Sequence, residues 1–211
     1  RHVTLSRAVA TEACRRAANG VELADRVRRE TGIVLDIISA AEEARLAALG
    51  CHNLMEPGDG PALIFDIGGG STELMHVDIS DHDVAIRDWI SVPWGVVSLT
   101  EHAPPSEDNL SARQASYAHM RAVTREAFAG FAERVKCYEG QPLRLLGTSG
   151  TVTTLASVFL DLPRYDRRAV DGLVVPTDAM RDISRRLAEA SLDDRAEIAC
   201  IGRERADLVV A

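Results

Sequence analysis

The chain has 211 residues, enough for one large domain or two small ones, and 46% of them are hydrophobic. Its formal net charge of -8 excludes the broad basic face that non-specific DNA binding requires. Its four cysteines are scattered without a CxxC pair, and no apolar run is long enough to span a bilayer. We therefore expect a cytoplasmic protein with neither a DNA nor a membrane partner.

Strands and helices alternate in the first part of the chain, which is typical of an α/β fold. Ser39 predicts a helix cap, because its hydroxyl can accept from the first turn and two glutamates follow in that turn. In chain order we predict a strand over 3–10, a helix over 11–18, a helix over 20–31 ended by Gly32, a strand over 33–39 and a helix from Ser39 that ends before Gly50.

Two prolines and two glycines within residues 56–61 mark the clearest break in the chain. Apolar residues recur at three- and four-residue spacing after residue 108 and predict one long helix there. The other predicted elements are strands over 62–67 and 71–78, a turn over 79–83, a strand region over 84–99 interrupted at Pro93, a strand over 144–147, and helices over 151–160, from 176 onward and over 193–211.

Residues 66–73 read DIGGGSTE, with three consecutive glycines between two predicted strands. Glycines let a backbone turn sharply and bring several N–H groups close to an oxyanion. Two flanking carboxylates, Asp66 and Glu73, suit Mg²⁺, which takes few protein oxygens and completes its shell with water and phosphate. A Walker loop needs a GK[ST] ending and a dinucleotide fingerprint needs a following helix, so neither fits. The remaining alternative is an ordinary glycine hairpin.

A second glycine-containing segment, residues 147–151 (GTSGT), lies between a predicted strand and a predicted helix. That arrangement directs the free amides of a helix N-terminus at an anion. Such clusters often merely cap helices, but two loops of this kind can bind successive phosphates.

Glu42 and Glu43 precede Ala44 and Arg45 in the first turn of a predicted helix. A carboxylate near a bound terminal phosphate can orient and deprotonate water for in-line attack. Adjacent glutamates in a first turn are also common as solvated charges that favour the helix dipole. The spacing leaves both interpretations open.

These three elements, which follow one another along the chain as EEAR, DIGGGSTE and GTSGT, resemble the exopolyphosphatase and guanosine pentaphosphate phosphohydrolase (Ppx/GppA) family. That family belongs to the actin, sugar kinase and Hsp70 ATPase superfamily. The resemblance implies α/β, ribonuclease-H-like lobes and covers nearly the whole chain. The matching stretches are residues 10–17 (ATEACRRA), 31–50, 63–74 (LIFDIGGGSTEL), 89–101, 145–156 (LLGTSGTVTTLA), 164–172 and 201–211 (IGRERADLVVA).

The resemblance also implies roles by position. The catalytic glutamate of the family is the second of the EEAR pair, which is Glu43, and Arg45 is a candidate for orienting it. Asp66 and Glu73 correspond to the acidic residues associated with Mg²⁺ or another divalent cation. The phosphate-binding residues are Gly68, Gly69, Gly70, Ser71, Gly147, Thr148, Ser149, Gly150 and Thr151.

The chain departs from the family pattern in two places. Ala40 stands where the family usually has glycine, a change that a helix start tolerates. The family begins with a further strand–turn–strand phosphate loop, and nothing like it precedes Arg1. We therefore expect a fragment, with the later half of a first lobe at 1–56, a second lobe at 57–211, and reduced or absent activity.

The predicted activity is metal-assisted hydrolysis of a terminal phosphoanhydride bond of inorganic polyphosphate or guanosine pentaphosphate. Three alternatives stay open: a phosphotransferase of the same superfamily, a non-catalytic sensor of these polyphosphates, and a structural interaction protein. A homodimer is also open, because the family is often dimeric. No role is assigned to Arg164, Arg167 or Arg168.

Overall fold

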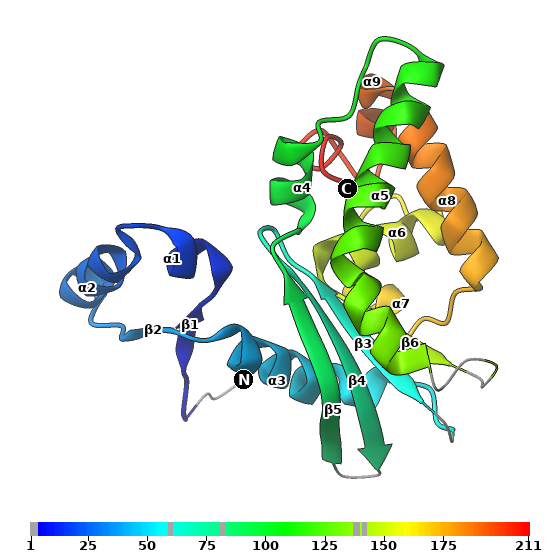
Figure 1. Ribbon diagram of the computed structural model, residues 1–211. Helices are drawn as coiled ribbons and strands as arrows, with labels where there is room; N and C mark the ends of the chain where they lie inside the picture. The colour runs from blue at the N-terminus through cyan, green and yellow to red at the C-terminus, as the bar shows by residue number, and fades with distance from the viewer. Residues whose placement is uncertain (1–3, 59–60, 81–82, 137–139, 141–142) are drawn as a thin grey trace. The chain divides into compact units, whose positions relative to one another are not determined.

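The computed structural model describes residues 4–58, 61–80, 83–136, 140 and 143–211. These divide into two compact units, Arg1–Ala47 and Ala48–Ala211, each of which mixes helices with strands as the α/β prediction requires (Figure 1). The two units are defined by their internal contacts, whereas the predicted lobe boundary after residue 56 separates two folds. That boundary stays a prediction. Of the helices in the described part of the chain, none is long and apolar enough to cross a membrane.

The first unit is built around two short parallel strands joined by two helices. Ala8 pairs with Leu35 and Ala10 with Ile37. The second helix ends at Gly32, whose φ of 76° is the left-handed conformation common after a helix, as its sequence position predicts. The elements are β1 (Ala8–Ala10), α1 (Glu12–Arg16), α2 (Gly20–Thr31) and β2 (Leu35–Ile37). Residue 3, the start of the first predicted strand, lies outside the described residues.

Helix α3 (Ala40–Cys51) begins where the sequence predicts, since the Ser39 hydroxyl accepts the Glu42 N–H at 3.2 Å. The prediction that it ends before Gly50 is wrong. An interior glycine costs a helix roughly 0.5–1 kcal/mol, too little to stop it when the flanking turns are stable. The short 3-10 helix η1 (His52–Leu54) follows.

The second unit contains a four-stranded mixed sheet in the order β5-β4-β3-β6 (Figure 1). β3 and β4 form an antiparallel pair, as do β4 and β5, whereas β6 runs parallel to β3. The strands are β3 (Ala62–Ile67), β4 (Thr72–Ser80), β5 (Asp83–Val92) and β6 (Arg144–Thr148). Residues 59–60 of the predicted break and 81–82 of the predicted turn lie outside the described residues.

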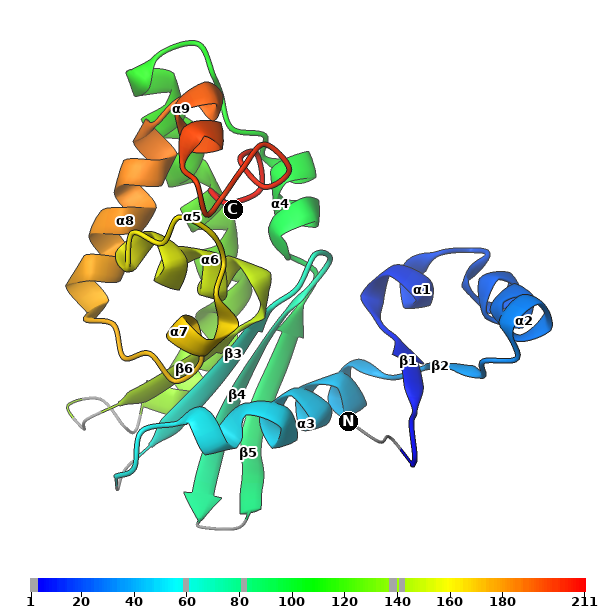
Figure 2. The same ribbon diagram turned by 180° about the vertical axis from the view of Figure 1, so that it is seen from behind.

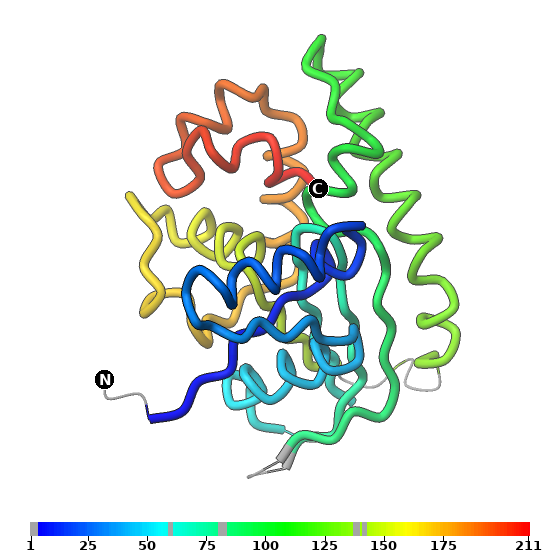
Figure 3. Tube along the Cα trace, turned by 90° about the vertical axis from the view of Figure 1, so that its left-hand side faces the viewer, coloured from blue at the N-terminus to red at the C-terminus, as the bar shows by residue number. Residues whose placement is uncertain are grey.

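In the described part of the second unit, helices α4, α5, α6, α8 and α9 share one apolar core with the C-terminal turns. Leu99 and Ala103 of α4 belong to this core together with Ile201 and Ala206 of the turns, and the turns lie beside α4 in Figure 2 and Figure 3. α8 packs against both α5 and α6. The helices are α4 (Val96–His102), α5 (Leu110–Val135), α6 (Ser149–Phe159), α7 (Arg167–Val170), α8 (Thr177–Glu189) and α9 (Leu192–Glu197).

Three sequence predictions in this unit are wrong. The turn predicted over 79–83 is wrong at both ends, because β4 continues to Ser80 and β5 begins at Asp83. The strand region predicted over 84–99 ends at Val92, and α4 follows, because tertiary hydrogen bonds satisfy its first amides (next section) and override its valine-rich β-propensity. The helix predicted over 193–211 stops at Glu197. Gly202 has a φ of 69°, which no right-handed helix contains, and the chain continues in turns.

Candidate functional site

The glycine-rich segment forms the predicted turn between two antiparallel strands. Asp66 faces Glu73 across the strand pair, and Ile67 faces Thr72. The Gly68 N–H donates to the Ser71 carbonyl at 2.9 Å and closes the turn. A strand, not a helix, follows the glycines, so the segment is neither a Walker loop nor a dinucleotide fingerprint.

The carbonyl groups of this turn face the N-terminus of α4. The Gly68 carbonyl accepts from the Val96 N–H at 3.0 Å, and the Gly69 carbonyl accepts from the Val97 N–H at 2.9 Å and the Ser98 N–H at 3.2 Å. These bonds satisfy the amides that a helix N-terminus leaves without intrahelical partners. The Ser98 hydroxyl additionally lies 3.2 Å from the Gly70 carbonyl oxygen.

This arrangement determines where the amides of the turn point. The described residues contain no cis peptide bond, and in a trans peptide the N–H points opposite to the C=O. Since the carbonyls of Gly68 and Gly69 point toward α4, the N–H groups of Gly69 and Gly70 point away from it. The turn therefore presents donors, and not acceptors, on the side opposite α4.

Gly95 allows α4 to approach this closely. A Cβ on Gly95 would lie 2.4 Å from the Gly68 carbonyl oxygen and 2.6 Å from that of Gly69. Its own backbone is extended, with φ of -113° and ψ of -177°, so the requirement is for space and not for a special conformation. The Thr72 hydroxyl donates to the neighbouring Trp94 carbonyl at 2.7 Å and ties the two segments together on the other side.

The second predicted loop lies at the same edge of the sheet as the first. Thr148 pairs with Asp66 in the parallel β3–β6 register, and its hydroxyl donates to the Asp66 carboxylate at 2.8 Å. Helix α6 starts directly afterwards, at Ser149, whose φ of 83° is unusual for a residue with a Cβ. Strained backbone of this kind occurs at ligand-binding sites, where the surrounding structure imposes it. The first amides of α6 are thus positioned for an anion.

Both loops line one cavity of about 130 Å³ in the second unit. Five of the predicted phosphate-binding residues line it, whereas Gly70, Ser71, Gly147 and Thr148 lie outside its lining. The lining residues are Ile67, Gly68, Gly69, Val96, Ser149, Gly150, Thr151, Thr154, Arg205, Leu208 and Val209. Arg164, Arg167 and Arg168 are not among them.

Arg205 is the cationic residue of this cavity, and the sequence prediction missed it. Its Nη1 donates to the Thr154 hydroxyl at 3.0 Å, and it lies against Gly150, where an added Cβ would come within 3.7 Å of Nη1. No carboxylate in the described part of the chain forms an ion pair with it. A guanidinium left with donors beside a helix N-terminus suits a phosphate group. The available signal was an arginine in the matching stretch 201–211.

The two predicted metal ligands, Asp66 and Glu73, lie on facing positions of one strand pair. Glu73 is 1% exposed and accepts from the Ser91 hydroxyl at 2.7 Å, while Asp66 is partly exposed. Among described residues no group of three or more His, Cys, Asp and Glu side chains could hold a metal. One or two carboxylates nevertheless suffice for Mg²⁺ that shares its shell with water and phosphate, so the residues present fit this ion.

Burial and the charge of Asp66 also affect Cys51 at the end of α3. Burial raises the pKa of the Cys51 thiol to about 11, and the negative charge of Asp66 contributes a smaller part of the rise. The thiol is therefore neutral at pH 7, and we assign it no chemical role.

The candidate base, Glu43, belongs to the first unit. Its carboxylate accepts from Arg15 Nη1 at 2.9 Å, and the same nitrogen donates to the Ile38 carbonyl at 2.9 Å. Glu12 accepts from the other side of the Arg15 guanidinium at 2.9 Å. The side chain of Glu43 is 17% exposed, so Arg15 fixes a carboxylate that still reaches solvent.

Glu42 has a different environment from its neighbour. It pairs with Arg45 at 2.8 Å and with Arg7 at 2.8 Å, and these two guanidinium groups lower its pKa from 4.5 to about 2, Arg45 more than Arg7. The expectation that Arg45 orients Glu43 is therefore wrong, because Arg45 binds Glu42 and Arg15 binds Glu43. The two adjacent glutamates, which the sequence did not distinguish, therefore have different partners.

Comparison with known proteins gives a consistent result. The model of the Ppx/GppA phosphatase family matches residues 2–211. The chain is 30% identical over 205 residues to exopolyphosphatase 1 of Mycobacterium leprae (97% of the chain, 58% of the relative). It is 29% identical over 186 residues to exopolyphosphatase 2 of Mycobacterium tuberculosis (84% and 53%). The chain thus spans little more than half the length of these relatives.

Two solved structures show the same relationship. An exopolyphosphatase-like protein superposes with a TM-score of 0.77 at 29% identity, covering 97% of this chain and 63% of that one. The Aquifex aeolicus PPX-GPPA enzyme superposes with a TM-score of 0.74 at 28% identity, covering 97% and 64%. The predicted α/β fold class with actin-like ATPase lobes is confirmed.

Proposed function

The chain belongs to the Ppx/GppA phosphatase family, and from this premise we propose that the protein hydrolyses the terminal phosphoanhydride bond of a polyphosphate chain. One observation carries the proposal: both predicted phosphate-binding loops and the Arg205 guanidinium line a single cavity. The names of the two mycobacterial relatives favour inorganic polyphosphate as the substrate. The terminal phosphate of guanosine pentaphosphate offers the same chemistry.

The cavity is suited to phosphoryl groups and not to a nucleoside. Its volume of about 130 Å³ lies well below the roughly 300–1,000 Å³ of pockets that enclose drug-sized molecules. The amides of the glycine turn, the N-terminus of α6 and the Arg205 guanidinium would neutralise the charge on the phosphoryl oxygens. A guanosine base, if present, would lie outside this cavity.

Asp66 and Glu73 are the proposed holders of the divalent cation. Mg²⁺ bound there would neutralise charge on the oxygens of the phosphoryl group that is transferred to water. The Thr148 hydroxyl donates to one Asp66 oxygen, which fixes the carboxylate and leaves its other oxygen for a ligand. The Ser91 hydroxyl donates to one Glu73 oxygen and orients that carboxylate.

Glu43 is the proposed base. A water oxygen forms a bond to the terminal phosphorus, the bond from phosphorus to the bridging oxygen breaks, and Glu43 takes the proton from the water. Orthophosphate and the shortened chain are the products. Arg15 fixes the Glu43 rotamer, so the carboxylate needs little ordering before attack.

The test compares two adjacent glutamates. We expect Glu43→Gln to reduce orthophosphate release from polyphosphate by roughly a hundredfold to ten-thousandfold without loss of fold, because the base is removed while the size is kept. Glu42→Gln is the matched control and should keep nearly normal turnover, since Glu42 pairs with Arg7 and Arg45. Near-normal turnover in Glu43→Gln would refute the assignment. Calorimetry with tripolyphosphate measures binding separately, and tight binding by the unaltered protein without turnover would indicate a sensor.

A further inference from the structure

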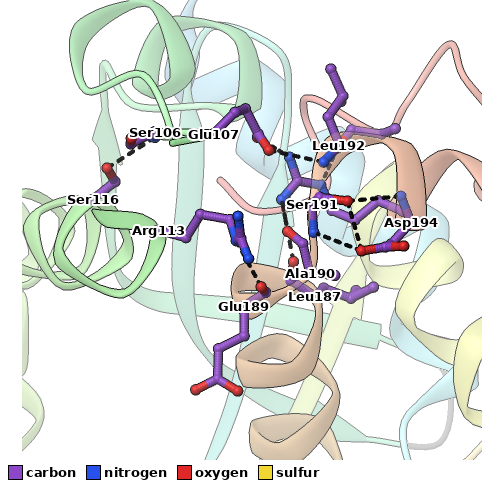
Figure 4. A network of polar contacts seen from close by, with 12 residues as sticks. Ser106, Glu107, Arg113, Ser116, Leu187, Glu189, Ala190, Ser191, Leu192 and Asp194 are labelled. Carbon is purple, nitrogen blue, oxygen red and sulfur yellow. Dashed lines mark hydrogen bonds and ion pairs between the residues drawn. The ribbon is translucent and has the colours of Figure 1, made fainter. Parts of the chain in front are cut away.

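A fully buried arginine, Arg195, belongs to a polar network at the end of α8, and Figure 4 labels its partners Glu107, Leu187 and Ala190. Arg195, on α9, is 0% exposed, and its Nη2 pairs with Glu107 at 2.7 Å. Its Nη1 donates to the carbonyls of Leu187 at 3.3 Å and Ala190 at 2.9 Å. Its Nε donates to the Ala206 carbonyl at 2.7 Å. Four donors of one side chain are thereby satisfied, which a buried guanidinium requires.

Part of this network stabilises a helix end. The last carbonyls of α8 have no intrahelical donors, and Arg195 donates to one of them, that of Leu187, and to the carbonyl of Ala190, the residue after the helix. The second oxygen of Glu107 accepts the Leu192 N–H at 2.9 Å, at the start of α9. Arg113 has a similar role, because its Nε donates to the Glu189 carbonyl at 2.7 Å. Arg113 therefore caps the end of α8 with a single bond to one carbonyl, whereas Arg195 makes further bonds beyond the helix end.

The bond from Arg195 to Ala206 reaches a different place. Ala206 directly follows Arg205, which lines the anion cavity together with Leu208 and Val209. The segment around it forms turns, in which the Arg205 N–H donates to the Gly202 carbonyl at 3.3 Å and the Arg205 carbonyl accepts from Leu208 at 3.1 Å and Val209 at 3.0 Å. These bonds lie within the segment, and the bond from Arg195 adds a contact from outside it. The Ala206 carbonyl is thus a point where a buried charged side chain fixes the backbone next to Arg205.

We propose that Arg195 is a positioning residue for the anion cavity: its bond to the Ala206 carbonyl holds the turn that places Arg205 beside Gly150. Glu107 holds Arg195 in turn by its charge. Lysine cannot replace Arg195, because its single nitrogen cannot reach acceptors on both sides as a planar guanidinium does. The inference rests on the proposed function of the cavity as a phosphate-binding site.

The experiment is a double-mutant cycle with tripolyphosphate as the probe and calorimetry as the measurement. Arg195→Lys should weaken binding about tenfold, the equivalent of one charge-assisted hydrogen bond. In an Arg205→Gln background the same change should have no further effect, because Arg195 acts through Arg205. Arg113→Lys is the matched control, which also alters a donor to the end of α8 but should leave affinity unchanged in both backgrounds.

A purely structural role predicts another pattern. Equal weakening by Arg195→Lys in both backgrounds, or unchanged affinity in a folded Arg195→Lys protein, would overturn the proposal. Should Arg195→Lys fail to fold, Glu107→Gln replaces it, with a smaller loss expected that again disappears in the Arg205→Gln background. A loss that persists there overturns the proposal.

Hydrogen exchange separates this inference from the proposed function. Exchange of amides 203–209 should be faster in Arg195→Lys than in the unaltered protein or in Arg113→Lys, with no ligand present. If the unaltered protein does not bind tripolyphosphate, the proposed function fails, and the exchange rates alone decide whether Arg195 fixes the turn. Equal rates in all three proteins would refute that role.

Discussion

The Gly95→Ala substitution tests whether the glycine turn depends on the close approach of α4. The new Cβ would lie 2.4 Å from the Gly68 carbonyl oxygen. Ordinary carbon–oxygen contacts are about 3.3 Å, so the turn and the helix must separate by roughly 1 Å. The backbone conformation of residue 95 is allowed for alanine, so no strain at that residue contributes.

Such a displacement breaks the bonds that orient the turn. The three backbone hydrogen bonds between α4 and the turn are 2.9–3.2 Å long and would exceed hydrogen-bonding distance. At about 1 kcal/mol each, their loss would lower the free energy of unfolding by roughly 2–3 kcal/mol. The amides of Gly69 and Gly70 would also rotate, and a misplacement of roughly 1 Å reduces turnover by about a hundredfold.

The assay is urea unfolding together with orthophosphate release from polyphosphate. Gly130→Ala is the control: it lies inside α5, where the nearest atom to an added Cβ is 3.9 Å away, and it should stabilise the fold by roughly 0.5–1 kcal/mol. Turnover and tripolyphosphate affinity equal to those of the unaltered protein in Gly95→Ala would refute the view that α4 orients the turn.

Two further predictions concern strain and pH. Ser149→Gly should raise the free energy of unfolding by roughly 0.5–1 kcal/mol, because glycine adopts the φ of 83° without strain, and tripolyphosphate affinity should stay within about threefold if backbone amides carry the binding. A large loss of affinity would assign the binding to the Ser149 hydroxyl. The lowered pKa of Glu42 means that its ion pairs stabilise the fold above pH 4.5 and that this contribution is lost as the pH falls toward about 2. Between pH 4.5 and about 2, the free energy of unfolding measured with urea should decrease less for Glu42→Gln than for the unaltered protein. The same decrease in both proteins would contradict the prediction.

Local signals predicted the parts of the fold that depend on local physics. The bounds of α2 and β3 agree with the sequence prediction, because an amphipathic period, a terminal glycine and a short apolar run are properties of the segments themselves. The start of α3 was predicted for the same reason, because the Ser39 hydroxyl accepts the N–H of Glu42, only three residues later. The glycine turn was predicted because three consecutive glycines between two predicted strands favour a sharp backbone turn.

Other errors and omissions arose where contacts with other segments decide. Residues 96–99 are rich in valine and resemble a strand, but the carbonyls of a turn nearly thirty residues earlier supply the acceptors that allow α4 to begin there. Glu42 and Glu43 are equivalent in spacing, and their partners distinguish them: Arg45 and Arg7 for Glu42, and Arg15 for Glu43. Arg205 could not be assigned from its sequence position, because it reaches the cavity from a segment with no regular structure.

The candidate site has a consistent construction that explains this difference. Each group that would contact phosphate or water is held by a residue outside its own motif: the glycine turn by α4, Glu43 by Arg15 and Arg205 by the bond from Arg195 to Ala206. The contacting groups form recognisable motifs because their chemistry constrains their type. The groups that hold them need only reach a carbonyl or a carboxylate, so they leave no motif. It follows that substitutions far from DIGGGSTE, at Gly95 or Arg195, should also impair the site, although no motif marks those positions.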